Sequence, residues 1–509
     1  MRDPYFSKVL VANRGEIAVR IFRTCHELGI ETVAVYSEAD SRAPHVWLAG
    51  EAYLIGPAPA SRSYLVIANI LDAAKRSGAE AVHPGYGFLA ENPEFAEAVT
   101  DAGLVWIGPP SGSMRLLGDK TAARKMAEAN KVPILPGTDQ PVRDLEEAIN
   151  AAGNIGYPVL LKAAAGGGGR GMRVVDSSEE LEDSLKLARS EAGSAFGDES
   201  VFIEKYLARP RHVEFQIMAD SHGGCVWLGD RECSVQRRHQ KIIEETPSPA
   251  LDHQLRQRMG TAAVRIVAAA GYRGAGTVEF LLEKGEFYFL EVNTRLQVEH
   301  TVTEMVTGRD LVSDQLGIAA GHPLGYSQEE IRPSGNSIEV RIYAEDPDNS
   351  FFPSPGHIDH IEAPSGPGIR HDSGVTMGSE VTLHYDPLIS KLIAWAPDRI
   401  GMINRINRAL EEFQITGVTT IIPFLREILT FEAFQSGNYT TQIVSEILEQ
   451  REGAGGDMDS SVFLAAVATA LFHDSRHGSP AVVFGRKPEG KVRNNGWVLK
   501  GRELREWER

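Results

Sequence analysis

The segment TVEFLLEKGEFYFLEVNTRLQVEH, residues 277–300, carries the pattern that decides the fold of the middle of this chain. Two runs rich in aromatic and β-branched residues flank Lys284-Gly285-Glu286, so the segment predicts a β-hairpin. If the turn centres on Gly285, Glu279 and Glu291 lie six residues away on either side. The two carboxylates then face each other across the strands, with their Cβ atoms about 4.5–5.5 Å apart.

The hairpin face that carries these carboxylates is suited to a metal ion. Strand periodicity adds further polar side chains to that face beyond Glu291, namely Asn293, Arg295 and Gln297. Two carboxylates and an amide are hard oxygen ligands of the kind that Mg²⁺ prefers. The alternative is a solvated face with cross-strand charge pairs, but facing like charges destabilise a hairpin unless a cation is present.

A run of glycines follows the strand predicted for residues 157–163. The run is GGGGRG, with Gly166, Gly167, Gly168, Gly169 and Gly171. Consecutive glycines weaken regular structure, but they let backbone N–H groups approach phosphate oxygens closely. No GK[ST] follows, so this is not a Walker A loop. A surface loop without a ligand is the alternative, and the preceding strand with Lys162 favours phosphate binding.

Two other segments carry weaker signals. Residues 230–241, DRECSVQRRHQK, concentrate basic side chains in an acidic protein, which suits an anionic substrate or an exposed basic strand. Cys233 within this segment is interpreted as a small packed residue. Residues 83–95, HPGYGFLAENPEF, form a tight loop after a strand, where α/β sheets place ligands, although taken alone the loop is an ordinary turn.

The composition excludes several classes of protein. The chain has 509 residues, with 69 acidic and 52 basic side chains and a net charge of −17, so nucleic acid and anionic membranes are unfavoured partners. Its three cysteines lack CxxC spacing, which argues against a disulfide framework or zinc site. The N-terminus lacks a signal-peptide core and the apolar run at 461–472 is too short to cross a bilayer. We therefore expect a cytoplasmic protein.

The order of strands and helices predicts an α/β and α+β multidomain protein. Strands at 8–12, 32–36, 81–82 and 104–107 alternate with helices such as 16–28, which is typical of a doubly wound parallel sheet. The first turn lacks GxGxxG, so a dinucleotide site is not supported. Residues 118–325 are mixed α+β, 338–395 are rich in strands, 400–450 are helical, and 451–459 have the composition of a linker.

Taken together, these segments resemble the biotin carboxylase family of the ATP-grasp superfamily, whose members are subunits of acetyl-CoA, propionyl-CoA or pyruvate carboxylases. The resemblance runs from about residue 6 to 450. Many separate motifs carry it in order: VANRGEIAVRI, HPGYGFLAEN, GDK at 118–120, YPVLLKAAAGGGGRGMRVV, FIEKYL, RHVEFQI, QRRHQK, RGAGTVEF, FLEVNTRLQVEH, EVRIYAEDP and YDPLISKL.

The resemblance implies a domain plan. Residues 1–117 would form a Rossmann-like N-terminal domain, and 118–330 an ATP-grasp domain whose glycine-lid subdomain covers about 133–207. Residues 331–450 would form a β-rich C-terminal domain. The remaining residues, 451–509, would be a linker and a tail without an assigned role.

The resemblance also implies a role for individual side chains. Nucleotide binding falls to the glycine loop, to the metal ligands Glu279 and Glu291, and to Lys120, Lys162, Glu204, Lys205, Leu207, His212, Gln236 and His239. Asn293 would complete the metal site. Bicarbonate would be bound by Lys241, Arg295, Gln297 and Val298. Glu299 would be the general base, with Arg295, Arg341 and Lys241 as further catalytic residues, and Tyr86 and Arg341 would lie at the biotin ring.

The reaction implied is the ATP-dependent carboxylation of biotin by bicarbonate through carboxyphosphate, with two Mg²⁺ or Mn²⁺ ions. The chain contains no Met-Lys-Met motif, so we expect biotin on a separate carboxyl carrier protein. A carboxyltransferase subunit would be a second partner, and it would select the final acceptor. The family further suggests a homodimer.

Two alternatives remain. A carbamoyl-phosphate-forming ATP-grasp ligase would share the nucleotide and metal residues, but it should not need HPGYGF together with RLQVEH. A non-catalytic, nucleotide-sensing scaffold would have lost a base or a metal ligand, whereas this chain retains all of them.

Overall fold

The computed structural model describes residues 5–163, 172–196 and 198–454. The chain divides into two units, 1–448 and 449–509. The helix α15 (Ile443–Ala454) extends into the predicted linker, so residues 451–454 are helical and that part of the linker prediction is wrong. The glycine loop at 166–171 and the tail beyond residue 454 lie outside the described residues.

The N-terminal part of the chain folds as a parallel sheet. Its strands lie in the order β3 (Glu51–Gly56), β2 (Glu31–Ser37), β1 (Lys8–Val11), β4 (Ala81–His83) and β5 (Val105–Trp106). They alternate with helices that include α1 (Gly15–Glu27), α3 (Ile67–Ser77) and α4 (Pro93–Asp101).

Both faces of this parallel sheet are packed. Val9 and Val11 belong to an apolar cluster with residues of α1, whereas Leu10 belongs to a second cluster with residues of α3. Successive side chains of a strand point to opposite faces, so the two clusters cover the two sides of the sheet. The doubly wound parallel sheet predicted from the sequence is therefore confirmed.

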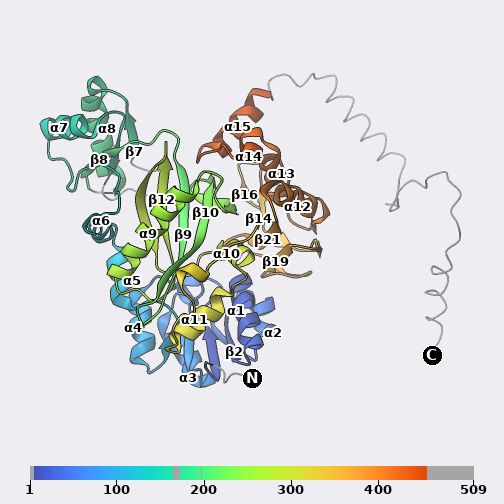
Figure 1. Cartoon of the computed structure of the whole chain (residues 1–509). Coiled ribbons are helices and arrows are strands. Elements are labelled where there is room, and N and C mark those ends of the chain that lie inside the picture. The colour runs from blue at the N-terminus through green and yellow to red at the C-terminus, as the bar shows by residue number, and fades with distance from the viewer. Residues whose placement is uncertain (1–4, 164–171, 197, 455–509) are drawn as a thin grey trace, which may run out of the picture. The chain divides into compact units, whose positions relative to one another are not determined.

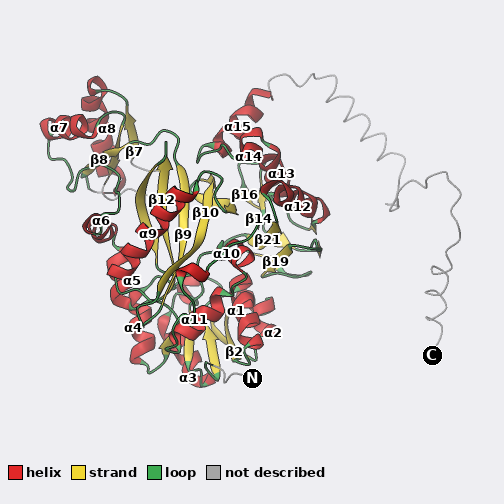
Figure 2. Cartoon of the chain, in the orientation of Figure 1, coloured by secondary structure: helices red, strands yellow, loops and turns green. Residues whose placement is uncertain are grey.

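A central antiparallel sheet of eight strands follows (Figure 2). Its order is β13 (Glu286–Asn293), β12 (Gly274–Glu283), β9 (Arg211–Ala219), β10 (Cys225–Arg237), β11 (Gln240–Thr246), β14 (Asn336–Tyr343), β21 (Leu388–Ala396) and β19 (Ile369–Ser373). The strand-rich character of residues 338–395 is confirmed. However, β14, β21 and β19 continue the central sheet by hydrogen bonding, so the expected boundary near residue 330 does not separate two sheets.

The two faces of the central sheet differ in chemistry. Along β9, Val213, Phe215 and Ile217 pack into the apolar cluster beneath α9 (His253–Ala269), which contacts β9 and β10. The alternate side chains, including Glu214 and Gln216, point to the other face, where α10 (His300–Thr307) packs on β10, β11 and β14. These polar side chains are buried, so this face is a polar interior.

A smaller unit lies between β5 and the central sheet in the sequence. Strand β6 (Val159–Ala163) pairs with β7 (Met172–Val175) and β8 (Val201–Lys205), and α7 (Leu145–Ile155) and α8 (Ser178–Phe196) pack against them. This unit has its own apolar core, and it falls within the range 133–207 that the resemblance assigns to the lid subdomain.

The C-terminal strands are covered by helices, as expected for residues 400–450. Helix α12 (Arg399–Glu412) packs on β14 and β21, and α13 (Ile422–Thr430) and α14 (Glu432–Ser436) follow it. A short strand, β22 (Gln414–Thr416), interrupts the helical region. Among the described residues, every helix is too short or too polar to span a lipid bilayer.

Candidate active site

The β12–β13 hairpin sets two carboxylates face to face. Its turn consists of Lys284 and Gly285, both with positive φ (53° and 81°), which is the geometry of a two-residue hairpin turn. The strand register shifts by one between Phe280 and Glu279, where Leu290 is an extra residue in β13. Glu279 therefore pairs with Glu291. The predicted pairing is confirmed, although the turn centre is displaced and a bulge restores the register.

Glu279 is buried among hydrogen-bond donors. Its Oε1 accepts hydrogen bonds from Lys241 Nζ at 3.0 Å, from Asn293 Nδ2 at 2.8 Å and from Gln297 Nε2 at 3.0 Å. Its Oε2 lies 2.7 Å from His212 Nε2. Burial alone would raise the pKa of Glu279, but Lys241 and His212 outweigh burial and hold it well below its ordinary value. The carboxylate is therefore ionised.

Glu291 lies in a less favourable position. Burial, and after it the facing Glu279, raise the pKa of Glu291, and the nearest cation, Lys120 Nζ, is 4.0 Å away. An additional cation between the two carboxylates would relieve this repulsion, so the donor set fits Mg²⁺ or Mn²⁺. Asn293 lies beside the pair, with its Oδ1 accepting a hydrogen bond from Arg295 at 3.2 Å.

Lys241, on β11, lies at the centre of a group of three carboxylates. Its Nζ is 2.5 Å from Glu214, 3.0 Å from Glu279 and 2.7 Å from Glu299. Burial would lower the pKa of Lys241, but the neighbouring Cys233 and carboxylates raise it well above its ordinary value. One permanent positive charge therefore links the hairpin with the residue assigned as the base.

Glu299 is completely buried and is held by two cations. Lys241 donates to its Oε1, and the Arg341 guanidinium donates to its Oε2 at 3.0 Å. Burial would raise the pKa of Glu299, but Lys241 and Arg341 hold it far below its ordinary value. Arg341 also contacts Glu244, whose pKa is raised, chiefly by burial.

Two residues of this group were missed by the sequence reasoning. Glu214 on β9 binds Lys241, and it also accepts a 2.5 Å hydrogen bond from Arg231 on β10. Arg231 is completely buried and also donates to Gln216, Thr303 and Thr277. The polar–apolar alternation of RHVEFQI contains the signal, but such alternation more often marks a solvated strand face.

The segment after β13 does not follow the predicted strand periodicity. The strand ends at Asn293, so placing Arg295 and Gln297 by alternation was wrong. Gln297 still reaches Glu279, whereas Arg295 donates to Glu91 at 3.0 Å. The Val298 carbonyl accepts a 2.7 Å hydrogen bond from Lys391. The Glu91 contact joins Arg295 to the HPGYGF loop.

The residues assigned to nucleotide binding lie on several different elements. Lys162 and Glu204 form an ion pair of 2.9 Å in the small sheet, where Lys205 Nζ donates to the carbonyls of residues 156 and 157. Lys120 is the first residue of α6 (Lys120–Ala129) and is exposed.

The other assigned nucleotide residues lie beside or beyond that sheet. Leu207 follows β8 and is partly buried. His212 accepts a 2.6 Å hydrogen bond from Gln236 and lies in the carboxylate group. His239 lies in the exposed turn between β10 and β11.

The basic segment 230–241 is not an exposed strand. Asp230 to Val235 are buried, and only its end, at Arg238 and His239, is exposed. Cys233 is completely buried, so its interpretation as a packed residue is confirmed. The segment contributes Lys241 and Gln236 to the candidate site and Arg231 to its support.

Tyr86, assigned to the biotin ring, lies in the loop that follows β4. Its ring centre is 5.9 Å from Lys391 Nζ, and its backbone carbonyl accepts a 2.7 Å hydrogen bond from Asn13 Nδ2. Asn13 also binds the Pro84 carbonyl, so the turn before α1 anchors this loop.

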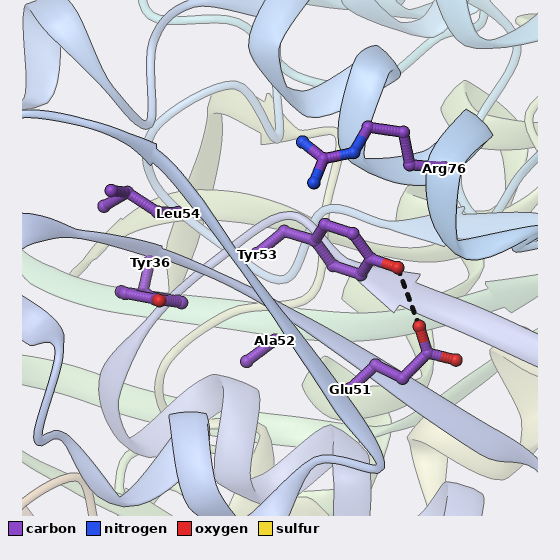
Figure 3. Close-up of a pocket in the computed structure, with 6 residues that line it drawn as sticks. All are labelled: Tyr36, Glu51, Ala52, Tyr53, Leu54 and Arg76. Atoms are coloured by element: carbon purple, nitrogen blue, oxygen red, sulfur yellow. Dashed lines mark hydrogen bonds between the residues drawn. The ribbon is translucent and has the colours of Figure 1, made fainter.

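A surface pocket lies apart from these side chains, at the open edge of the N-terminal sheet (Figure 3). The Tyr53 hydroxyl donates to Glu51 at 2.7 Å, and the Arg76 guanidinium lies over the Tyr53 ring, 5.0 Å from its centre, so Glu51 and Arg76 each contact Tyr53. The lining residues are Tyr36, Glu51, Ala52, Tyr53, Leu54 and Arg76. None of them has a role in the resemblance, and the carboxylate group around Lys241 remains the candidate site.

Three family models match the chain in succession. They are described as the biotin carboxylase N-terminal domain (residues 5–114), the carbamoyl-phosphate synthase L chain ATP-binding domain (119–327) and the biotin carboxylase C-terminal domain (339–446).

Curated relatives and a solved structure resemble the chain over most of its length. The biotin carboxylase of Nostoc is 51% identical over 443 residues, or 87% of this chain and 99% of the relative. The biotin carboxylase of Haemophilus influenzae is 50% identical over 446 residues, which are 87% of this chain and 99% of that protein. A solved structure, the biotin carboxylase domain dimer of Hydrogenobacter thermophilus 2-oxoglutarate carboxylase with MgADP, ADP and bicarbonate, matches with a TM-score of 0.79 and 49% identity, covering 87% of this chain and 97% of that one.

Proposed function

The chain belongs to the biotin carboxylase family, and on that basis we propose that it is a ligase that uses ATP and bicarbonate to carboxylate biotin carried on a separate protein. One observation carries the proposal. Lys241 and Arg341 converge on the buried Glu299 directly beside the facing carboxylates Glu279 and Glu291. A metal-nucleotide position and a proton acceptor are thus joined through one ammonium group.

The facing carboxylates and Asn293 would hold Mg²⁺ or Mn²⁺, two ions in all. The metal would supply charge neutralisation at the nucleotide phosphates. Lys120 and Lys162 would bind phosphate oxygens, and the glycine loop would close over them. Glu204, Lys205 and Leu207 would contact the adenine. The exposure of Lys120 supports this role, because a phosphate can reach its ammonium without displacing a buried partner.

Glu299 would act as the base that takes the proton of bicarbonate. Its low pKa belongs to the state in which both cations bind it. Bicarbonate bound by Lys241, Arg295, Gln297 and Val298 would share the Lys241 charge, which weakens the hold on Glu299 and raises its pKa.

Phosphoryl transfer would follow proton removal. The deprotonated oxygen attacks the γ-phosphorus and the bond to ADP breaks, which gives carboxyphosphate. Carboxyphosphate then splits into CO₂ and phosphate. This phosphate takes the ureido N–H proton of biotin, and the biotin nitrogen then bonds to the carbon of CO₂. Arg341, a permanent cation, would stabilise the resulting anion beside Tyr86. Because the steps involve little covalent chemistry by the protein, positioning and charge account for the catalysis.

The assembly and the compartment are part of the same proposal. A biotin carboxyl carrier protein and a carboxyltransferase subunit would be the partners, and the latter would choose the acyl or keto-acid acceptor. The dimeric relative supports a homodimer. The described cysteines are free thiols, which supports a reducing cytoplasmic location.

The experiment supplies the purified chain with ATP, Mg²⁺, free biotin and ¹⁸O-labelled bicarbonate. We expect ADP release that requires both bicarbonate and biotin, with one ¹⁸O atom transferred to phosphate per turnover, because the bicarbonate oxygen attacks phosphorus. ADP release that depends on ammonia and ignores biotin would favour the carbamoyl-phosphate-forming alternative. Nucleotide binding without turnover would favour the scaffold.

A further inference from the structure

Lys391, which has no role in the mechanism above, is a completely buried lysine at a junction of three segments. It lies on β21, between β14 and β19 in the central sheet (Figure 1). Its Nζ donates a 2.7 Å hydrogen bond to the Val298 carbonyl and lies 3.3 Å from Glu16 on α1. The same atom lies 5.9 Å from the centre of the Tyr86 ring.

The position of Lys391 in the sheet is unfavourable for a lysine. Arg341 is its direct neighbour on β14, and Asp372 is its neighbour on β19. Two cations directly opposite each other repel, and burial of an ammonium group is costly unless it is paired. A hydrophobic residue would fill a sheet interior at lower cost, so a structural role explains the lysine poorly.

The three carboxylates around Lys391 differ in whether they have another partner. Asp372 binds Arg370, and Glu339 accepts a hydrogen bond from Thr301 and lies 3.9 Å from Lys391. Glu16, by contrast, is buried, and Lys391 is its only ion-pair partner within 4.0 Å among the described residues. Glu16 thus depends on Lys391 for its neutralising charge, whereas the hydrogen bond of Lys391 goes to the Val298 carbonyl.

The Val298 carbonyl matters because the assigned base comes directly after it in the chain. Glu299 is the next residue and the N-cap of α10, so its side chain starts from the peptide that Lys391 holds. Tyr86 belongs to the loop anchored by Asn13, two residues before α1. Lys391 therefore bonds to the backbone that presents the assigned base and lies over the ring assigned to biotin.

We propose that Lys391 is a positioning residue. It fixes the Val298–Glu299 peptide relative to Tyr86, and so sets the distance between the base Glu299 and the biotin ring. The proposal rests on the proposed function and deepens it. A biotin-dependent step needs both sides of this junction, whereas the described nucleotide side chains on β6, β8 and α6 bind partners other than Lys391.

The test measures kcat and the KM values for ATP, bicarbonate and free biotin in bicarbonate-dependent ADP release by the full chain. We expect Lys391→Met to lower kcat/KM for biotin about 100-fold, because a displacement of about 1 Å at a reacting group has that effect. The KM for ATP should stay within about twofold, because the substitution does not alter the side chains assigned to nucleotide binding.

Glu16→Gln is the matched control, because it abolishes the Glu16–Lys391 ion pair but leaves the bond to Val298. We expect this variant to keep activity within about threefold, because the Glu16–Lys391 ion pair does not itself orient the Val298–Glu299 peptide. Lys391→Arg keeps a cationic donor, and we expect recovery to within about tenfold of the unsubstituted chain. If the methionine variant fails to fold, Lys391→Gln replaces it in the same comparison.

The possible outcomes distinguish failure of the positioning role from failure of the proposed function. Equal losses in Lys391→Met and Glu16→Gln would reduce Lys391 to an ion-pair partner and overturn the positioning role, as would unchanged activity in both. Absence of biotin-dependent ADP release in the unsubstituted chain would instead overturn the proposed function.

Discussion

At the scale of single residues, the candidate site depends on buried charges that share partners. Lys241 binds three carboxylates, and Glu299 binds two cations. Such a group is stable only while every member is paired, because an unpaired buried charge costs several kcal/mol. In the proposed function, a substrate anion would share cations that these contacts already hold in place.

Glu291 offers the clearest test of metal binding. Glu291→Gln removes one of the two facing carboxylates, and we expect the Mg²⁺ concentration for half-maximal ADP release to rise at least about tenfold. Glu286→Gln, an exposed glutamate on the same strand, is the control and should leave this concentration unchanged. An identical Mg²⁺ dependence in the two variants would remove Glu291 from the metal site.

Arg231 should matter for stability. Arg231→Met leaves Glu214 buried with Lys241 as its remaining cationic contact, and we expect a loss of about 3 kcal/mol, seen as a lower thermal midpoint. Adding Glu214→Gln should recover part of the loss, because the two substitutions act on one contact. Strict additivity of the two effects would show that Arg231 does not act through Glu214. Arg238→Met, at an exposed position, is the control.

At the scale of elements, the β12–β13 hairpin defines the site through its register. The extra residue, Leu290, is partly exposed and compensates for the two-residue turn, so that Glu291 faces Glu279. A shift by one residue would send Glu291 to the other face of the strand. The bulge is thus a requirement of the proposed metal site.

Deletion of Leu290 tests this requirement. We expect the deletion to abolish Mg²⁺-dependent ADP release, at least about a 100-fold loss, because the facing carboxylates separate. Leu290→Ala keeps the register and should change activity little. Mg²⁺-dependent turnover that survived the deletion would contradict the role of the bulge, provided that circular dichroism shows a folded chain.

How well the sequence predicts these elements depends on whether a feature is set by local strand pairing or by contacts with residues far along the chain. Spacing about a turn predicts the Glu279–Glu291 pair, since strand pairing is local. It misplaces Arg295, because the strand ends at Asn293 and tertiary contact with Glu91 then directs the side chain. Glu214 and Arg231 escape detection because burial of a polar strand face depends on α10, which lies far along the chain.

At the scale of the whole molecule, one continuous sheet joins the central and C-terminal strands, and α1 of the N-terminal sheet reaches it through Glu16 and Lys391. Burial, opposed by Lys391, raises the pKa of Glu16 from 4.5 to about 7. The folded chain therefore holds a proton on Glu16 between these two pH values that the unfolded chain releases. The stability that Glu16 contributes through this bound proton is fully present below pH 4.5 and is lost as the pH rises through 7.

Glu16→Gln removes this titration. We expect the variant to gain stability relative to the unsubstituted chain between about pH 5 and pH 8, by up to about 3 kcal/mol, measured as the difference in thermal midpoints at the two pH values. Glu27→Gln, at an exposed position of α1, should show the same difference at both. A pH-independent difference for Glu16→Gln would contradict the raised pKa.

The most direct measurement compares the unsubstituted chain with Glu299→Gln in bicarbonate-dependent ADP release with free biotin, alongside ATP binding by calorimetry. If Glu299 is the base beside the metal-nucleotide position, biotin-dependent turnover falls at least about 100-fold while ATP affinity stays within about threefold. Equal turnover in the two proteins would contradict the account, because no other described carboxylate is held by both Lys241 and Arg341.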